Sequence, residues 1–121
     1  MLTFQMREIQ LYKSENGRSP VEDFLESLPG KLYQKISWTL NVVRELPIVP
    51  KEYFKKLSGT NDIWEIRVHL GSDAVRLLAF FDGNEVIILT NGFIKKTDKV
   101  PKREIELAEE RKKDYLRRKR I

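Results

Sequence analysis

The chain contains no cysteine and only one histidine, His69. The absence of cysteine excludes a disulfide framework, a thiol nucleophile and any zinc or iron–sulfur site with cysteine ligands. A single histidine likewise excludes a histidine-rich metal site and a ribonuclease mechanism that needs two histidines. The sequence therefore predicts a protein that works without a metal ion or any other cofactor.

Long apolar runs are also missing. No stretch of about 18 apolar residues is present, so the sequence predicts no membrane-spanning helix. The chain starts with alternating polar and apolar residues, which is unlike a secretory signal, and we expect a cytoplasmic protein. Its 121 residues, 40% of them hydrophobic, predict one domain with a modest core over residues 1–121.

Positive charge is in excess, and it is concentrated at one end of the chain. The formal net charge is +5. Residues 1–94 hold 11 Lys and Arg against 12 Asp and Glu, whereas residues 95–121 hold 12 against 6. The basic residues of this last part form two clusters: Lys95, Lys96, Lys99, Lys102 and Arg103, and then Arg117, Arg118, Lys119 and Arg120. Such an excess indicates either a polyanionic partner or a solvated basic surface.

The periodicity of the apolar residues predicts, in chain order, a strand, two helices, three strands and a charged helix. Ser19 is a typical N-cap, and the Pro29-Gly30 pair separates the two helices, which should form a hairpin that lies on the sheet. The final helix has only a narrow apolar stripe, so we expect it to be mostly solvated or covered by a partner. The elements are expected over residues 2–12, 19–28, 31–46, 63–70, 74–81, 85–91 and 101–120.

The loop Gly71-Ser72 fixes how two of the predicted strands pair. Gly suits the first central position of a type II′ turn, which places Leu70 opposite Asp73. A shift by one residue would destroy the apolar face that this register produces. On the other face, the same register places Arg67 directly opposite Arg76. The apolar face consists of Trp64, Ile66, Val68, Val75, Leu77 and Ala79.

Two facing arginines are unfavourable by a few tenths to about 1 kcal/mol, and two interpretations of the pair are open. In the first, Glu65 neutralises one arginine, and the face is an ordinary salt-bridged surface. In the second, Arg67 and Arg76 bind a phosphate, which a guanidinium group matches with two hydrogen bonds. Glu65 is then either a counter-ion or a general base, and His69, on the same face, is either an incidental polar residue or a catalytic one.

Five short motifs follow one another along most of the chain: KLSG at 56–59, WEIR at 64–67, VRLLAFF at 75–81, NGFIKKT at 91–97 and VPKREI at 100–105. In this order and at these spacings, the series resembles the HigB-like, phage-derived branch of the RelE/ParE toxin superfamily. The resemblance covers nearly the whole chain, from the opening strand and the turn at residues 17–21 to residues 108–111.

The resemblance implies an α+β fold, in which an N-terminal helix hairpin packs on a twisted, mostly antiparallel sheet, with the charged helix at the C-terminus. It also implies the toxin of a type II toxin–antitoxin system, an endoribonuclease that cleaves mRNA on the ribosome by attack of the 2′-OH on the adjacent phosphate. The implied partners are mRNA, the ribosome and a cognate helix-turn-helix antitoxin, which alone would contact operator DNA. The alternative is a basic toxin or binding module without nuclease activity, directed at gyrase or at RNA.

The resemblance also assigns residues to the site. Arg67 and Arg76 match the basic strand residues of the family's active site, and Lys95 and Lys96 match the basic pair after the last strand. Glu65, or a lysine whose pKa is lowered by neighbouring cations, is the expected base. The residues expected to bind RNA around this group are Lys55, Lys56, His69, Lys99, Lys102 and Arg103.

Two positions depart from the family pattern. Asn91 stands where many relatives have histidine before Gly-Phe. Tyr115 lies too far along the final helix to act as the base that some ribosome-dependent members use. The residue that transfers the proton therefore stays open at this point.

Overall fold

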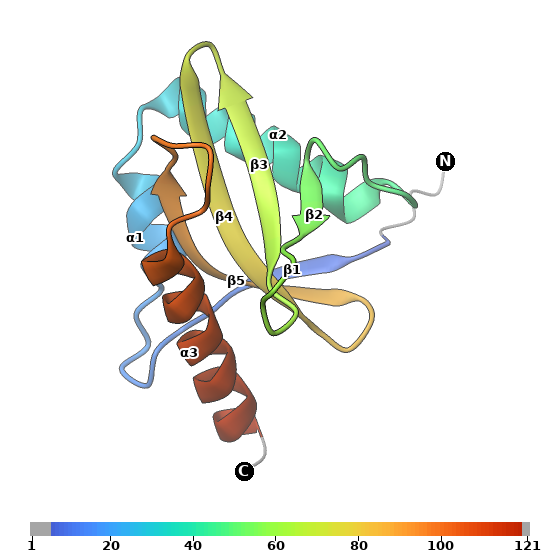
Figure 1. Ribbon diagram of the computed structural model, residues 1–121, viewed down its shortest axis with the longest axis vertical. Coiled ribbons are helices and arrows are strands. Elements are labelled where there is room, and N and C mark those ends of the chain that lie inside the picture. Colours follow the sequence, from blue (N-terminus) through green and yellow to red (C-terminus); the bar gives the residue numbers. More distant parts are fainter. Residues whose placement is uncertain (1–5, 120–121) are drawn as a thin grey trace.

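Five strands form one mixed sheet that is flanked by three helices in the computed structural model (Figure 1). The strand order is β1-β5-β4-β3-β2; β1 runs parallel to β5, and the other neighbours are antiparallel. The predicted α+β class and the C-terminal helix are confirmed. The elements are β1 (Glu8–Leu11), α1 (Pro20–Glu26), α2 (Gly30–Glu45), β2 (Phe54–Lys56), β3 (Trp64–Leu70), β4 (Asp73–Asp82), β5 (Val86–Ile94) and α3 (Lys102–Lys119).

The structure describes residues 6–119. The predicted strand at residues 2–12 therefore begins outside the described residues, and residue 120 of the predicted final helix also lies outside them. No helix within 6–119 is long and apolar enough to cross a membrane.

The first two helices begin and end where the sequence signals predict. Ser19 caps α1, because its Oγ accepts a hydrogen bond from the backbone N–H of Glu22 at 3.2 Å. α2 ends at Glu45, just before Leu46-Pro47. The expected N-terminal helix hairpin is not confirmed, since both helices follow β1 in the chain.

The sheet has a hydrophobic core on each face. α1 and α2 cover one face, which carries the predicted apolar residues of β3 and β4. α3 lies against the other face, in front of the sheet in Figure 1, and its stripe of Ile105, Ala108 and Tyr115 packs on Leu78 and Phe80. The predicted narrow apolar stripe is confirmed; only Ala108 of the described part of this helix is fully buried, and the partner of the stripe is the second face of the sheet.

The predicted register of β3 and β4 is confirmed at every pair. Gly71 has φ of +61°, as the first central position of a type II′ turn requires, and Leu70 pairs with Asp73. Arg67 consequently faces Arg76. A bulge between Leu78 and Ala79 then shifts the pairing of β4 with β5.

Two features of the sheet were not predicted. β2 is an edge strand of three residues that includes Lys55 and Lys56, which the sequence suggested only as a loop before the next strand. β5 continues to Ile94, past the predicted end at residue 91. Gly92 lies in this extension, where a Cβ atom would be only 2.5 Å from the ring of Phe24, so α1 can approach β5 closely only over a glycine.

Candidate active site around a buried glutamate

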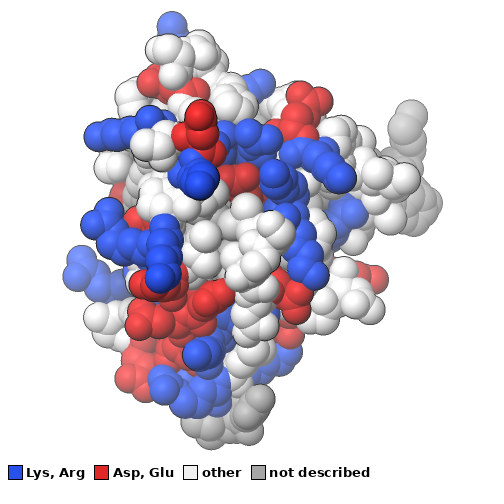
Figure 2. Space-filling model, viewed as in Figure 1, with Lys and Arg blue, Asp and Glu red and all other residues white. Residues whose placement is uncertain are grey.

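α3 covers only part of its face of the sheet, and the uncovered part over β3 and β4 carries a group of charged side chains. Since successive side chains of a strand point to opposite faces, Glu65 and Arg67 of β3 share this face with Arg76 of β4. Lys55 of β2 stands opposite Glu65 on the edge side. Figure 2 shows Lys and Arg side chains on this face over β2 and near the start of α3.

Glu65 lies between the two arginines. Its Oε2 is 3.1 Å from Nε of Arg76, and its Oε1 is 3.6 Å from Nε of Arg67. Only 4% of the Glu65 side chain and 2% of the Arg76 side chain are exposed, against 29% of the Arg67 side chain. One buried carboxylate is therefore shared by two guanidinium groups, and Arg67 is the one that solvent and a ligand can reach.

Glu65, Arg67 and Arg76 form ion pairs, but several of their polar atoms lack a hydrogen-bond partner. Nη1 of Arg76 donates to the carbonyl oxygen of Val75 at 3.1 Å. Oε2 of Glu65 and the Nε atoms of both arginines are buried without an aligned hydrogen-bond partner. Burial lowers the pKa of Arg76; the charge of Glu65 opposes this shift, and that of Arg67 adds to it. Two guanidinium groups beside one carboxylate leave a surplus of positive charge, which suits an anion such as phosphate.

Lys95 and His69 lie at the rim of this group. The backbone N–H of Lys95 donates a hydrogen bond of 2.8 Å to the carbonyl oxygen of Ala74. This bond places the start of the loop after β5 beside the first residues of β4. Partial burial lowers the pKa of Lys95, and the positive charge of Arg76 lowers it further. The pKa of His69 is also lowered, first by partial burial and then by the charges of Arg76, Arg67 and Lys95. The structure thus brings these predicted residues together around the arginines.

Within residues 6–119, no hydrogen bond or ion pair to Arg67 or Arg76 is seen for the other residues that the sequence assigned to the site. Lys96 is exposed. Lys56 forms an ion pair of 2.7 Å with Asp62, and it stands opposite Trp64 rather than Glu65. The exposed residues Lys99, Lys102 and Arg103 lie in the loop before α3 and in its first turn.

Asn91 has a role that the sequence did not reveal. Its side chain is buried, and Nδ2 donates to the backbone oxygen and to Oε1 of Glu104 at 3.2 and 3.0 Å. Its Oδ1 accepts a hydrogen bond from Oγ1 of Thr90 at 2.6 Å. Asn91 therefore ties the beginning of α3 to β5, and with it the basic residues Lys102 and Arg103. The only sequence signal for this residue was its departure from the histidine of relatives.

The chain matches the model of a known protein family. The model of the family described as Phage derived protein Gp49-like (DUF891) matches residues 23–113, which include every element from α2 to β5 and the residues of the candidate site. No curated protein matches the sequence. Among the described residues, no group of three or more His, Cys, Asp or Glu side chains is placed to hold a metal ion.

Replacement of Glu65 by glutamine tests the buried ion pairs. The change leaves the charge of Arg76 buried and uncompensated, so we expect the free energy of unfolding to fall by roughly 3–5 kcal/mol in urea titrations. The double variant Glu65→Gln/Arg76→Met should recover much of this loss, because it removes the unpaired charge. Asp62→Asn is the matched control, since its ion pair with Lys56 is exposed, and it should change stability little. If the Glu65→Gln variant is as stable as Asp62→Asn, Glu65 does not neutralise the two arginines.

The titration of His69 reports the charge around it. Because His69 is the only histidine of the chain, its NMR signal is unambiguous. We expect a titration midpoint below 6.5, the ordinary value for histidine, because partial burial and then the nearby cations oppose protonation. Glu65→Gln should lower the midpoint further, and Lys95→Met should raise it. A midpoint at or above 6.5 in the native protein would show that the cations do not converge on this face.

Proposed function

The chain belongs to the Gp49-like family of phage-derived proteins, and on this premise we propose that it is an endoribonuclease toxin that cleaves mRNA. The family is part of the RelE/HigB-like toxin superfamily, and its members are often toxin-like modules. The observation that carries the proposal is the arrangement of Glu65 between Arg67 and Arg76 on an open sheet face. Such a group costs stability, and a function that needs positive charge at a fixed place explains its presence.

In the proposed reaction, the 2′ oxygen of a ribose attacks the neighbouring phosphorus while the bond from phosphorus to the 5′ oxygen breaks. The products are a 2′,3′-cyclic phosphate and a 5′-hydroxyl. The phosphate gains negative charge in the transition state, and Arg67, the more exposed of the two arginines, would stabilise it. Arg76 is buried, so its proposed part is to position Glu65, which in turn orients Arg67.

The reaction also needs a group that removes the proton of the 2′-OH and one that protonates the 5′ oxygen. Lys95 is our first candidate for proton transfer, because its pKa is lowered and it lies at the rim of the arginines. His69 is the second candidate, since its lowered pKa keeps the ring neutral and able to accept a proton at neutral pH. Glu65, held between two guanidinium groups, is better suited to be a counter-ion than a base.

The proposed partners follow from the family and from the distribution of charge. A toxin-like family suggests an antitoxin, and we propose one with a helix-turn-helix domain, through which operator DNA would be bound. We further propose that the substrate is mRNA on the ribosome in the cytoplasm. The exposed lysines Lys96, Lys99 and Lys102, together with Arg103, would then contact phosphates of mRNA or ribosomal RNA.

One observation favours a second candidate function. With 2% of its side chain exposed, Arg76 cannot contact RNA without a rearrangement, so the arginine pair can also be a structural feature under a basic binding surface. The protein would then be a toxin or RNA-binding module without nuclease activity.

Arg67→Ala separates the two functions. We expect this variant to fold normally and to lose cleavage by roughly 100- to 1000-fold, as when one group that stabilises the transition state is removed. The measurement is primer extension on cellular mRNA after induction, together with growth of the culture. Arg18→Ala, which removes an exposed arginine from the loop before α1, is the matched control and should arrest growth like the native protein. Full toxicity of Arg67→Ala, or growth arrest without discrete cuts, would contradict the nuclease.

A further inference from the structure

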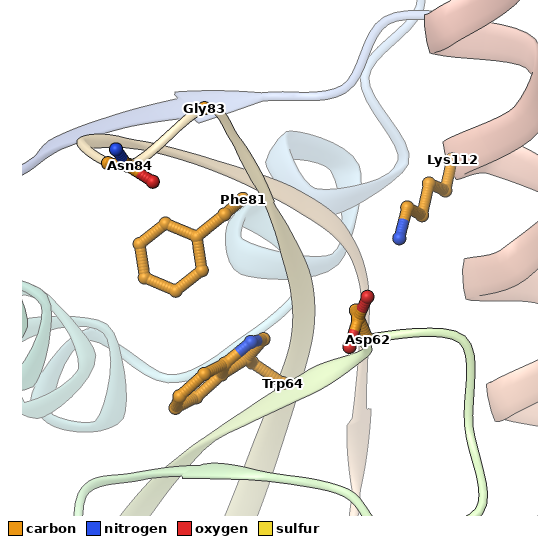
Figure 3. A pocket seen from close by; sticks show the side chains of 6 residues that line it. All are labelled: Asp62, Trp64, Phe81, Gly83, Asn84 and Lys112. Carbon is orange, nitrogen blue, oxygen red and sulfur yellow. The ribbon is translucent and has the colours of Figure 1, made fainter.

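Two cavities flank Trp64 where β3 begins. The first, of about 410 Å³, is lined by Val49, Lys51, Phe54, Lys55, Lys56 and Trp64. The second, of about 380 Å³, is lined by Asp62, Trp64, Phe81, Gly83, Asn84 and Lys112 (Figure 3). We call Trp64 and the residues that line these two cavities the Trp64 edge.

Aromatic rings form the apolar part of the Trp64 edge. Trp64 stacks on Phe54 with ring centres 4.6 Å apart, and it meets Phe81 at a steep angle with centres 5.4 Å apart. Trp64 and Phe81 are only half-buried, so parts of both rings are open to solvent. The indole N–H of Trp64 lies on the side of the second cavity in Figure 3, and it has no hydrogen-bond acceptor among residues 6–119. The rings thus offer an apolar packing surface that is partly open to solvent.

The charged part of the Trp64 edge is almost entirely positive. Lys51, Lys55 and Lys56 line the first cavity, and Lys112 lines the second. Asp62 is the only acidic residue among those that line the two cavities, and its charge is balanced by the ion pair of 2.7 Å with Lys56. Exposed aromatic rings with lysines along their length are the combination by which proteins hold single-stranded nucleic acid, since the rings pack against bases and the lysines attract phosphates.

The Trp64 edge adjoins the candidate active site. Trp64 directly precedes Glu65, so its side chain points to the opposite face of the sheet, at the edge that β2 forms. It stands three residues before Arg67, which is about 10 Å along β3. Lys55 belongs to both places, because it lines the first cavity and also stands opposite Glu65 in the sheet. An extended chain with one phosphate at Arg67 can therefore continue over the β2 edge to Trp64.

We propose that the Trp64 edge binds unpaired bases of the single-stranded RNA whose backbone phosphate lies at Arg67. This inference rests on the proposed ribonuclease function, and it adds a subsite that holds bases beside the cleaved phosphate. The bases pack against the open parts of the Trp64 and Phe81 rings, while Lys51, Lys55 and Lys112 contact the flanking phosphates. The cavities are shared along a strand edge instead of enclosing one ligand, which fits a chain better than a free nucleotide.

Tryptophan fluorescence reports occupancy of this subsite directly. The chain has two tryptophans, so the variant Trp38→Phe leaves Trp64 as the only one. The probe is a short oligouridylate with methylated 2′ oxygens, which the proposed reaction cannot cleave. We expect it to quench the emission of Trp64 at saturation, whereas uridine monophosphate at the same nucleotide concentration should not. Saturable quenching by uridine monophosphate alone would overturn strand binding in favour of a free nucleotide, and no quenching by the oligonucleotide would overturn the subsite.

Two variants test the rings and the lysines separately, with the anisotropy of a labelled oligouridylate as readout. Trp64→Leu should raise the Kd by about 5- to 150-fold, the effect of losing one stacked base. Lys51→Ser/Lys55→Ser changes only exposed side chains, and it should reduce the slope of log K against log salt by about 1.4, the value for two phosphate contacts of a single strand. Lys13→Ser/Lys31→Ser is the matched control and should leave this slope unchanged. If the slope of the first pair equals that of the control, the inference is wrong.

Failure of this subsite and failure of the ribonuclease give different results. If cellular mRNA stays uncut while the oligonucleotide still quenches Trp64, the binding subsite stands and only the nuclease proposal fails. If mRNA is cut and the Trp64→Leu variant binds and cuts as the native protein does, the nuclease stands and the subsite is refuted.

Discussion

The carboxylate of Glu65 is the constraint on which the candidate site depends. The register of β3 and β4 forces Arg67 and Arg76 to face each other, and a pair of like charges this close would be unfavourable without a shared counter-ion. Glu65 contacts both guanidinium groups, yet it cannot satisfy all of their donors. The result is a surplus of positive charge on rigid strands, and it reaches solvent at the more exposed guanidinium group, that of Arg67, where a phosphate can bind.

One face of the sheet forms the main hydrophobic core, and the other face also carries the candidate site. The face under α1 and α2 is a continuous apolar core, whereas α3 covers the other face only in part. The uncovered part contains the arginines, and Asn91 ties the start of α3 beside it by two hydrogen bonds to Glu104. Lys95 and His69 approach the same place from the loop after β5 and from the end of β3. The pKa of each is lowered first by partial burial and then by the cations they share.

The sequence was sufficient for the parts that local rules determine. A glycine in the Gly71-Ser72 turn and strict alternation in the two strands predicted the facing of Arg67 and Arg76 without any structure. Burial was not predictable in this way. Arg76 is buried in a central strand between β3 and β5, and the position of β5 beside β4 depends on residues that follow β4 in the chain. The three residues of β2 were too short for a periodic signal, and Trp64 was assigned only to the core, although it also lines two cavities at the edge of the sheet.

The ends of the RNA produced by the protein test the proposed chemistry most directly. Attack by the 2′ oxygen leaves a 2′,3′-cyclic phosphate, or the phosphate from its hydrolysis, on one fragment and a 5′-hydroxyl on the other. Mass spectrometry of fragments formed from mRNA in the presence of ribosomes should show these ends for the native protein and none above background for Arg67→Ala. Fragments with 5′-phosphate and 3′-hydroxyl ends, or mRNA that remains intact, would contradict a site in which Arg67 stabilises a phosphate attacked by its own ribose.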